Sequence, residues 1–479
     1  MPEHFPLLVP GASPAPTPTE VDAPWDGSVI ATIDTAGRDA VEIALARAHA
    51  LYRDRDAWLP ETTRIEILER TAELMRGRRE ELALEAAREG GKPLADSYVE
   101  VDRALDGVRG CVDLLRTRAG RMVPMGINAA SQGRLAFTRH EPIGVVLAFS
   151  AFNHPVNLIV HQVCPAVAAG CPFIVKPAEA TPLSCMRVVQ ILHEAGLPEA
   201  WGQALLTTDL DVAGALVRDP RVAFFSFIGS GQVGWMLRSQ LAPGARCALE
   251  HGGAAPVVVA ADADLDDATT LLAKGGFYHA GQVCVSVQRI FADRSVARDL
   301  AERLAAAGRV LRVGDPTDPQ TEVGPLIRPT EVQRVHGWVR GAAGAGAEVL
   351  CGGDPLTERC YAPTVLFDPP PDVEVSTLEV FGPVVCVYPV DTLDVAVERS
   401  NSLPYAFQAA VFTRDIDTAL RVSGRLDAAA VMVNDHTAFR VDWMPFAGLR
   451  ESGFGTGGIP YTLDDMQVEK LVVIRSPEL

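Results

Sequence analysis

Short apolar segments alternate with helix-like segments through the middle of the chain, and this alternation limits the possible folds more than any other feature. Strands separated by helices do not pair as hairpins, so they line up in a parallel sheet that the helices cover. The pattern therefore predicts an α/β fold. The predicted strands and helices are, in chain order, Phe173–Val175, Pro182–Ala195, Val222–Ile228, Gln232–Gln240, Ala255–Ala260 and Leu265–Gly276.

A second set of strands follows, and a helical region precedes both sets. The later strands are expected near Val285–Ala292, Val384–Tyr388, Ala409–Phe412 and Ala430–Val433. Apolar residues at helical spacing predict early helices at Arg38–Leu51, Glu61–Arg88 and Leu94–Arg118. The first two dozen residues are proline-rich, and we expect them to be irregular.

Two strand-like segments have no obvious partner in this scheme. One is the first part of Arg134–Phe149, which holds β-type residues around a turn at Glu141–Pro142. The other is Glu469–Arg475, the last strand-like segment of the chain. An isolated strand needs a partner, so we expect each to pair with another domain or another subunit.

Bulk composition excludes several classes of function. A length of 479 residues suggests two or three domains. The net charge of −18, with no basic run, opposes nucleic-acid binding. Polar residues interrupt the apolar run Pro155–Val175, so it does not predict a membrane span, and no secretory signal is visible. The nine cysteines form no C-x-x-C pair, which indicates free thiols in the cytoplasm, and we predict no metal site.

Gly229–Gly234 is a G-x-G-x-x-G motif that follows a predicted strand and opens a predicted helix. Glycines let the backbone approach a pyrophosphate, and the helix N-terminus supplies free N–H groups. The alternative is a simple tight turn. An acid about 20 residues further on would normally bind the ribose. Glu250 lies near that spacing, but its surroundings point to another role.

Six further motifs accompany this loop. They are Ala151–Pro155, Val175–Glu179, Glu250–Gly253, Ala280–Cys284, Glu379–Pro383 and Pro445–Arg450, the last followed by Ser452–Gly455. In this order and at these separations the motifs resemble those of the aldehyde dehydrogenase superfamily. The resemblance covers nearly the whole chain and is far more specific than any one motif.

The resemblance implies a catalytic set of three residues. Cys284 matches the nucleophile, Glu250 the general base, and Asn153 the amide that binds the oxyanion. An aldehyde gives up hydride readily only after its carbon becomes tetrahedral, and a thiolate is the side chain best suited to attack it. The thioester that remains must be hydrolysed, which requires a carboxylate to take a proton from water.

The resemblance also implies a cofactor site for NAD, with NADP less favoured. Lys176 and Glu179 match the residues that hold the adenosine ribose, and Glu379 matches the one that binds the nicotinamide ribose. Phe381 matches a residue that contacts the same end of the cofactor. The residues that match the pyrophosphate turn are Gly229, Ser230 and Gly234.

The domain layout implied by the family has three parts. Residues 1–120 and 140–249 would form a Rossmann-like NAD-binding domain, and residues 250–455 an α/β catalytic domain. Residues 121–139 and 456–479 would form a small β oligomerisation element. The implied assembly is a homodimer or a homotetramer.

Several positions depart from the family pattern without removing a reacting atom. His251 replaces a leucine after the base, and we expect it to pack rather than to alter the pKa of Glu250. The other departures are Ile228, the pair Ala254–Ala255, Ala406 after Tyr405, and Ala447.

Polar residues mark the expected substrate pocket. His154, Asn157 and His161 have spacings of three and four residues, so they share one helical face. Arg440 lies in a loop that borders the aldehyde tunnel in the family, and its surroundings resemble the lactaldehyde and semialdehyde dehydrogenase branch. A guanidinium beside imidazoles suits an anionic or hydroxylated tail. Alternatively, Arg440 pairs with Asp442 and the histidines are satisfied structurally.

Two other functions remain open at this stage. A coenzyme A-acylating semialdehyde dehydrogenase would form the same thioester, but it has less need of Glu250. A non-catalytic structural relative would have no need of Cys284, Asn153 and Glu250 together.

Overall fold

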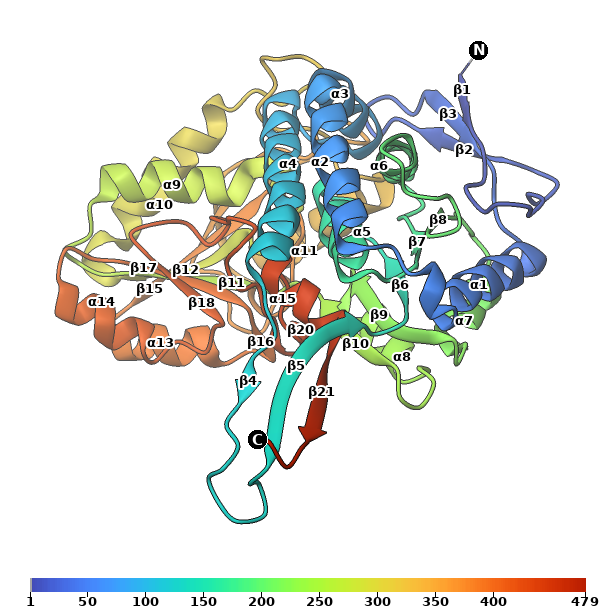
Figure 1. Ribbon diagram of the computed structural model, residues 1–479. Helices are drawn as coiled ribbons and strands as arrows, with labels where there is room; N and C mark the ends of the chain where they lie inside the picture. Colours follow the sequence, from blue (N-terminus) through green and yellow to red (C-terminus); the bar gives the residue numbers. More distant parts are fainter. Residues whose placement is uncertain (1) are drawn as a thin grey trace.

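The computed structural model describes residues 2–479, and two largely parallel sheets form its framework (Figure 1). This arrangement confirms the predicted α/β fold. The first sheet has the order β20-β10-β9-β6-β7-β8, and only β10 and β20 run antiparallel. Its strands are β6 Val145–Phe149, β7 Phe173–Lys176, β8 Gly202–Ala204, β9 Val222–Ile228, β10 Arg246–Glu250 and β20 Gly453–Phe454.

The chain leaves β6 toward β7 and β8, then returns to β9 and β10 on the other side of β6. The segments that follow β6 and β9 therefore diverge at the carboxyl ends of these neighbouring strands. Parallel α/β sheets bind ligands at such a reversal of strand order. Asn153 follows β6 and Gly229 follows β9, so both lie at this edge.

The second sheet has the order β13-β14-β15-β12-β11-β17-β18, with only β13 and β14 antiparallel. Its strands are β11 Ala255–Val259, β12 Val287–Asp293, β13 Glu348–Cys351, β14 Thr364–Phe367, β15 Val384–Val390, β17 Gln408–Phe412 and β18 Ala430–Val433. Cys284 lies just before β12, so this sheet carries the predicted nucleophile.

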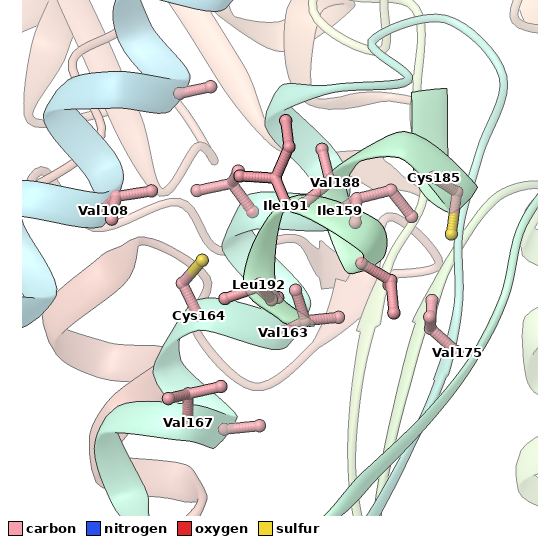
Figure 2. Close-up of a cluster of buried hydrophobic side chains, with 14 of the residues drawn as sticks. Val108, Ile159, Val163, Cys164, Val167, Val175, Cys185, Val188, Ile191 and Leu192 are labelled. Carbon is pink, nitrogen blue, oxygen red and sulfur yellow. The ribbon is translucent and has the colours of Figure 1, made fainter. Parts of the chain in front are cut away.

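Helices cover both faces of the first sheet because its strands are apolar on both sides. Successive residues of β6 point to opposite faces, so Val146 and Ala148 join the core under α2, α4, α5 and α6, whereas Leu147 joins the core under α1 and α7. Their bounds are α1 Arg38–Arg53, α2 Glu61–Gly77, α4 Leu94–Thr117, α5 Asn157–Ala169, α6 Leu183–Glu194 and α7 Leu210–Arg218. Figure 2 shows part of the larger core, in which Cys164 and valines of α5 lie beside Leu192 of α6 and Val108 of α4.

The remaining helices are α3 Arg79–Gly90, α8 Gly231–Arg238, α9 Leu265–Phe277, α10 Arg294–Val310, α11 Pro329–Gly344, α12 Glu374–Thr377, α13 Leu393–Asn401, α14 Ile416–Ser423 and α15 Ile459–Asp465, with 3-10 turns η1 Arg55–Ala57 and η2 Tyr278–Gly281. Most of the longer ones pack on the second sheet, whose buried residues form a separate core.

A buried carboxylate determines where α5 begins. Glu100 of α4 accepts hydrogen bonds from the backbone N–H groups of Val156 and Asn157 at 2.8 and 2.9 Å, and it pairs with the buried Lys92. A negative charge at a helix N-terminus satisfies its free donors and complements its dipole. Since α5 follows Asn153 directly, this cap also helps to fix a predicted site residue.

Three local predictions are wrong. The turn expected at Glu141–Pro142 lies two residues later, at Ile143–Gly144, because Glu141 and Pro142 end the strand β5 Arg134–Pro142. The N-terminal residues are partly regular, because β1 Glu3–Phe5, β2 Thr19–Asp22 and β3 Val29–Ile33 form a small sheet. The single helix predicted over Glu61–Arg88 is two helices, α2 and α3, which meet at Arg78. Gly77 at the end of α2 was the available signal, since glycine is a weak helix former.

The two unpartnered strands pair with each other. β21 Gln467–Arg475 runs antiparallel to β5 Arg134–Pro142 along its whole length, and β4 Met122–Val123 pairs with the other edge of β5. Figure 1 shows this sheet projecting below the body of the molecule. The short strands β16 Tyr405–Ala406 and β19 Leu449–Arg450 form a separate antiparallel pair. The three-part domain layout stays a prediction; its boundary at 139/140 would divide β5.

We predict that β21 mediates assembly into a homodimer or a dimer of dimers. β21 is the outer strand of its sheet, and its side chains Leu471 and Val473 are 51% and 48% exposed. Such an apolar edge is a surface for pairing with another copy. Deletion from Glu469 onward should give monomers or aggregates in analytical ultracentrifugation. An unchanged assembly would contradict this prediction.

Candidate active site

A strained turn presents the predicted nucleophile. His279 and Ala280 in η2 have φ values of 48° and 53°, and Gly281 follows at 69°. A Cβ on Gly281 would lie 2.1 Å from the carbonyl oxygen of Gly382, so only glycine fits. Strained backbone of this kind persists where the surrounding structure holds it, and it is frequent at functional sites. The turn places Cys284, partly buried, at the start of the second sheet.

The thiol of Cys284 is neutral at rest. Burial raises its pKa to about 12, and the nearby charges of Glu379 and Glu250 raise it further, while Arg440 opposes them. A thiol is a weak nucleophile until it loses its proton. Attack by Cys284 therefore needs a proton acceptor in the same pocket.

Glu250 is an available acceptor. Its backbone is fixed, because it ends β10, pairs with Gly453, and accepts a hydrogen bond from the N–H of Gly229 at 3.0 Å. Its carboxylate makes no hydrogen bond or ion pair with any residue in the range 2–479. Burial raises the pKa of Glu250, and the positive charge of Arg440 opposes this shift. The carboxylate is thus poised rather than locked in a salt bridge, as a general base requires.

Asn153 connects the two sheets at this point. It is buried, and its Nδ2 donates a hydrogen bond to the carbonyl oxygen of Gln282 at 3.0 Å. Gln282 in turn donates from its side chain to Pro325 and accepts from the N–H of Ile327. The second hydrogen of Asn153 Nδ2 remains able to donate. The structure therefore brings this amide to the segment that ends in Cys284.

The turn from β9 to α8 offers an open helix N-terminus. Ser230 is the N-cap residue of α8, and no side chain in residues 2–479 caps the first turn of this helix. His251 packs behind this turn: its Nδ1 donates to the carbonyl oxygen of Gly229 at 2.9 Å, and a Cβ on Gly234 would lie 2.0 Å from its ring. This confirms the packing role predicted for His251. The free N–H groups of α8 suit a phosphate.

The other predicted cofactor residues surround the same edge. Lys176 ends β7, and its ammonium lies 3.9 Å from the carboxylate of Glu179, which is 44% exposed. Glu379 rests on the backbone of Gly252, where a Cβ would lie 1.8 Å from its Oε1. Burial raises the pKa of Glu379 to about 8, and a hydrogen bond from the N–H of Gly253 opposes this. An open helix end and two carboxylates that can accept hydrogen bonds from ribose hydroxyls fit a dinucleotide.

Phe381 stands at the nicotinamide end of this predicted site. Its φ of 47° is left-handed, which is rare for an aromatic residue. Its ring packs edge-on against Phe152, with the centroids 5.8 Å apart. Since Phe152 precedes Asn153, Phe381 lies beside the predicted catalytic residues.

The polar face of α5 is organised by a residue from a distant loop. The buried carboxylate of Asp442 accepts a hydrogen bond from His161 at 2.7 Å and one from Asn157 at 3.1 Å. It also forms a two-pronged pair with Arg103 of α4, at 2.7 and 3.1 Å. Burial alone would raise the pKa of Asp442, but His161 and Arg103 hold it far below its usual range. His154, by contrast, bonds to the hydroxyl of Tyr278 at 2.8 Å.

Arg440 is left without a hydrogen-bond partner in residues 2–479. Its side chain is only 9% exposed, and its Nε lies 3.9 Å from Asp442, too far for a hydrogen bond. The guanidinium stacks on the ring of Phe446, 3.4 Å from the centroid. Burial lowers the pKa of Arg440, and the charge of Glu250 opposes this. A buried cation with free donors suits an anionic ligand.

Comparison with known proteins decides the family. The profile of the aldehyde dehydrogenase family matches residues 11–472. The 3-sulfolactaldehyde dehydrogenase of Priestia aryabhattai is 35% identical over 445 residues, which are 93% of this chain and 92% of that protein. The chain belongs to the aldehyde dehydrogenase family.

Solved structures agree with this assignment. Aldehyde dehydrogenase 21 from Physcomitrella patens, in complex with the reaction product succinate, has a TM-score of 0.95 at 31% identity and covers 99% of both chains. Glyceraldehyde-3-phosphate dehydrogenase from Methanocaldococcus jannaschii, complexed with NADP, has a TM-score of 0.91 at 32% identity, over 96% of this chain and all of that one. The protein is an NAD(P)-dependent aldehyde dehydrogenase.

The family resemblance identified most of the polar residues at this site, but it did not identify Arg103, which binds Asp442, or Tyr278, which binds His154. Arg103 lies 339 positions before Asp442, and no local pattern connects the two. Tyr278 adjoins the motif that ends in Cys284, so its position was the only available signal.

No helix in residues 2–479 is long and apolar enough to cross a membrane. Within the same residues, no group of three or more His, Cys, Asp or Glu side chains could hold a metal ion.

Proposed function

We propose that this aldehyde dehydrogenase uses NAD to oxidise a short aldehyde with an anionic tail to the carboxylic acid. The observation that carries the choice of substrate is the buried guanidinium of Arg440, which has no hydrogen-bond partner in residues 2–479. The catalytic roles of Cys284, Glu250 and Asn153 are part of the same proposal.

The first half of the reaction forms a covalent adduct. The Cys284 thiol transfers its proton to Glu250, and its sulfur bonds to the aldehyde carbon. The oxyanion that results accepts hydrogen bonds from Asn153 Nδ2 and from the backbone N–H of Cys284. When bound, NAD accepts the hydride that converts this adduct to a thioester, and it would be held by Lys176, Glu179, Glu379 and the turn at Gly229–Gly234.

The second half releases the acid. Glu250, once it is ionised again, takes a proton from water as the water oxygen attacks the thioester carbon. The carbon–sulfur bond then breaks, and the sulfur of Cys284 leaves as a thiolate. The unpaired carboxylate of Glu250 supports hydrolysis over acyl transfer to coenzyme A, which has less need of a base.

The tail of the substrate is assigned to Arg440. Asp442 lies 3.9 Å from Arg440, but the buried guanidinium donates no hydrogen bond within residues 2–479, so the pocket favours a negatively charged ligand that accepts its hydrogen bonds. His154, Asn157 and His161 would complete the polar wall, although His161 and Asn157 also hold Asp442. A sulfolactaldehyde, succinate and a glyceraldehyde phosphate, named for the three relatives, each carry an anionic group away from the reacting carbon.

The first prediction tests the two covalent half-reactions. Cys284→Ala should abolish turnover. Its binding of NAD, measured by fluorescence, should persist. Glu250→Gln should give a burst of NADH and then a steady state slower by roughly 10²- to 10⁴-fold, the usual contribution of a general base. Substantial oxidation by Cys284→Ala would refute the mechanism.

The pH dependence of the wild type follows from the same base. Because the pKa of Glu250 is raised and the base works in its ionised form, the rate of wild-type hydrolysis should fall as the pH drops through that raised pKa.

The second prediction concerns the cofactor. The carboxylate of Glu179 can accept hydrogen bonds from both ribose hydroxyls, and its charge should repel a 2′-phosphate. We expect a higher kcat/KM with NAD than with NADP, and Glu179→Gln should narrow the difference because Lys176 remains. Steady-state assays with both cofactors measure the ratio of the two kcat/KM values. A preference for NADP in the wild type would overturn the role proposed for Glu179.

The third prediction concerns the tail. Arg440→Leu should raise KM for an anionic aldehyde by roughly one to two orders of magnitude, as for a lost charge-assisted contact. Its effect on a neutral aldehyde of equal length should be small. Arg414→Leu, which removes an arginine that is 67% exposed on the surface, is the control and should change neither value. An equal loss for both aldehydes would show that Arg440 is structural.

A further inference from the structure

The carboxylate of Glu250 lies against a glycine from the C-terminal part of the chain. A Cβ built on Gly457 would lie 2.0 Å from Oε1 of Glu250 and 2.9 Å from its Cδ. The backbone of Gly457 is outside the left-handed region, so an L-residue could adopt it without strain. The glycine is therefore needed here for space and not for its backbone freedom.

The backbone of Gly457 cannot readily withdraw. It is bridged to Phe446, whose N–H donates to the carbonyl oxygen of Gly457 at 3.0 Å, while the N–H of Gly457 donates back at 2.7 Å. Phe446 is buried, and its ring packs on Phe407 with the centroids 4.4 Å apart. Cys284 packs against the same apolar cluster. The backbone at Gly457, which contacts Glu250, is thus held by the same apolar cluster that contacts Cys284.

The side chain of Glu250, unlike the backbone of Gly457, is free to move. Its main chain is fixed by two neighbouring strands, but no hydrogen bond from residues 2–479 orients its carboxylate. A side chain with several rotatable bonds moves more easily than a paired backbone. If a methyl group were added at position 457, the carboxylate of Glu250 would be displaced first.

We propose that Gly457 is a positioning residue for Glu250. Its missing side chain reserves the space in which the carboxylate now lies, so that the base is placed by contact and remains free of hydrogen bonds. This inference rests on the proposed role of Glu250 as the general base, and it adds a residue that does not itself touch the reacting atoms.

The test begins with Gly457→Ala. The first half-reaction should persist, so a single burst of NADH should appear. Hydrolysis should then be slower by about 100-fold, since a misplacement of about 1 Å can cost that factor. Gly337→Ala is the matched control: it adds the same methyl group in α11, where nothing lies within 4 Å, and it should leave both phases unchanged. A wild-type rate of hydrolysis in Gly457→Ala would overturn the proposal.

Hydroxylamine separates a displaced base from a damaged nucleophile. Acyl-enzyme is formed with one equivalent of aldehyde, and hydroxylamine is then added. Its nitrogen attacks the thioester carbon, the carbon–sulfur bond breaks, the Cys284 thiol is restored and a hydroxamate is released. A strong nucleophile has little need of the base, so hydroxamate release should be equally fast in Gly457→Ala and Glu250→Gln, the two variants whose acyl-enzyme persists long enough to be trapped. A slow release confined to Gly457→Ala would show a wider disturbance and refute the proposal.

A shorter carboxylate provides an independent check. Glu250→Asp withdraws the carboxylate from Gly457, so adding Gly457→Ala in that background should change hydrolysis by less than about twofold, because the two changes act through one contact. If Gly457→Ala unfolds with Glu250 but folds with Asp at position 250, the contact with the carboxylate is confirmed. Unfolding in both backgrounds would point to the carbonyl oxygen of Phe446, 3.1 Å from the added Cβ, and overturn the inference.

The same experiments distinguish this inference from the proposed function. If Glu250→Gln hydrolyses its thioester at the wild-type rate, Glu250 is not the base and the inference falls with that role. If Glu250→Gln is slow and Gly457→Ala is not, only the inference about Gly457 fails.

Discussion

The buried carboxylate of Asp442 links the two halves of the molecule. It belongs to the loop after β18 of the second sheet, yet its four hydrogen bonds go to Arg103 on α4 and to His161 and Asn157 on α5. Removing one partner of a buried ion pair typically costs about 3–5 kcal/mol, because the remaining charge is left uncompensated. This interaction therefore fixes the loop against the helices that follow and precede Asn153.

The position of Arg440 follows from this interaction. The oxygens of Asp442 already accept hydrogen bonds from α4 and α5. The Nε of Arg440 therefore lies 3.9 Å from Asp442, and the N–H donors of its guanidinium remain free. The stacking on Phe446 holds the guanidinium in place without using those donors. A fixed, unsatisfied cation is a preorganised site for an anion, since little ordering is left to be done when the ligand binds.

Carboxylates in and around the site are distinguished by their partners. Hydrogen bonds and positive charges hold the pKa of Asp442 low, so it stays ionised and structural. Glu250 and Glu379 are also shielded from water but have few such partners, and burial raises the pKa of both. Each of these two rests against a glycine, Gly457 and Gly252 respectively. Contact alone thus places the carboxylate of Glu250, whereas that of Glu379 also accepts a hydrogen bond from the N–H of Gly253.

The sequence by itself determined the α/β alternation, because a strand buried on both faces must be apolar throughout, as Val145–Phe149 and Phe173–Val175 are. It also indicated the family, since the motifs around Asn153, Glu250 and Cys284 are short runs of neighbouring residues that can be recognised without the tertiary structure. Only the tertiary structure decided the rest. The pairing of β21 with β5, the pair of Arg103 with Asp442, and the contact of Gly457 with Glu250 join residues hundreds of positions apart. Such contacts depend on how whole sheets and helices pack, and no local pattern of side chains records which distant surfaces will meet.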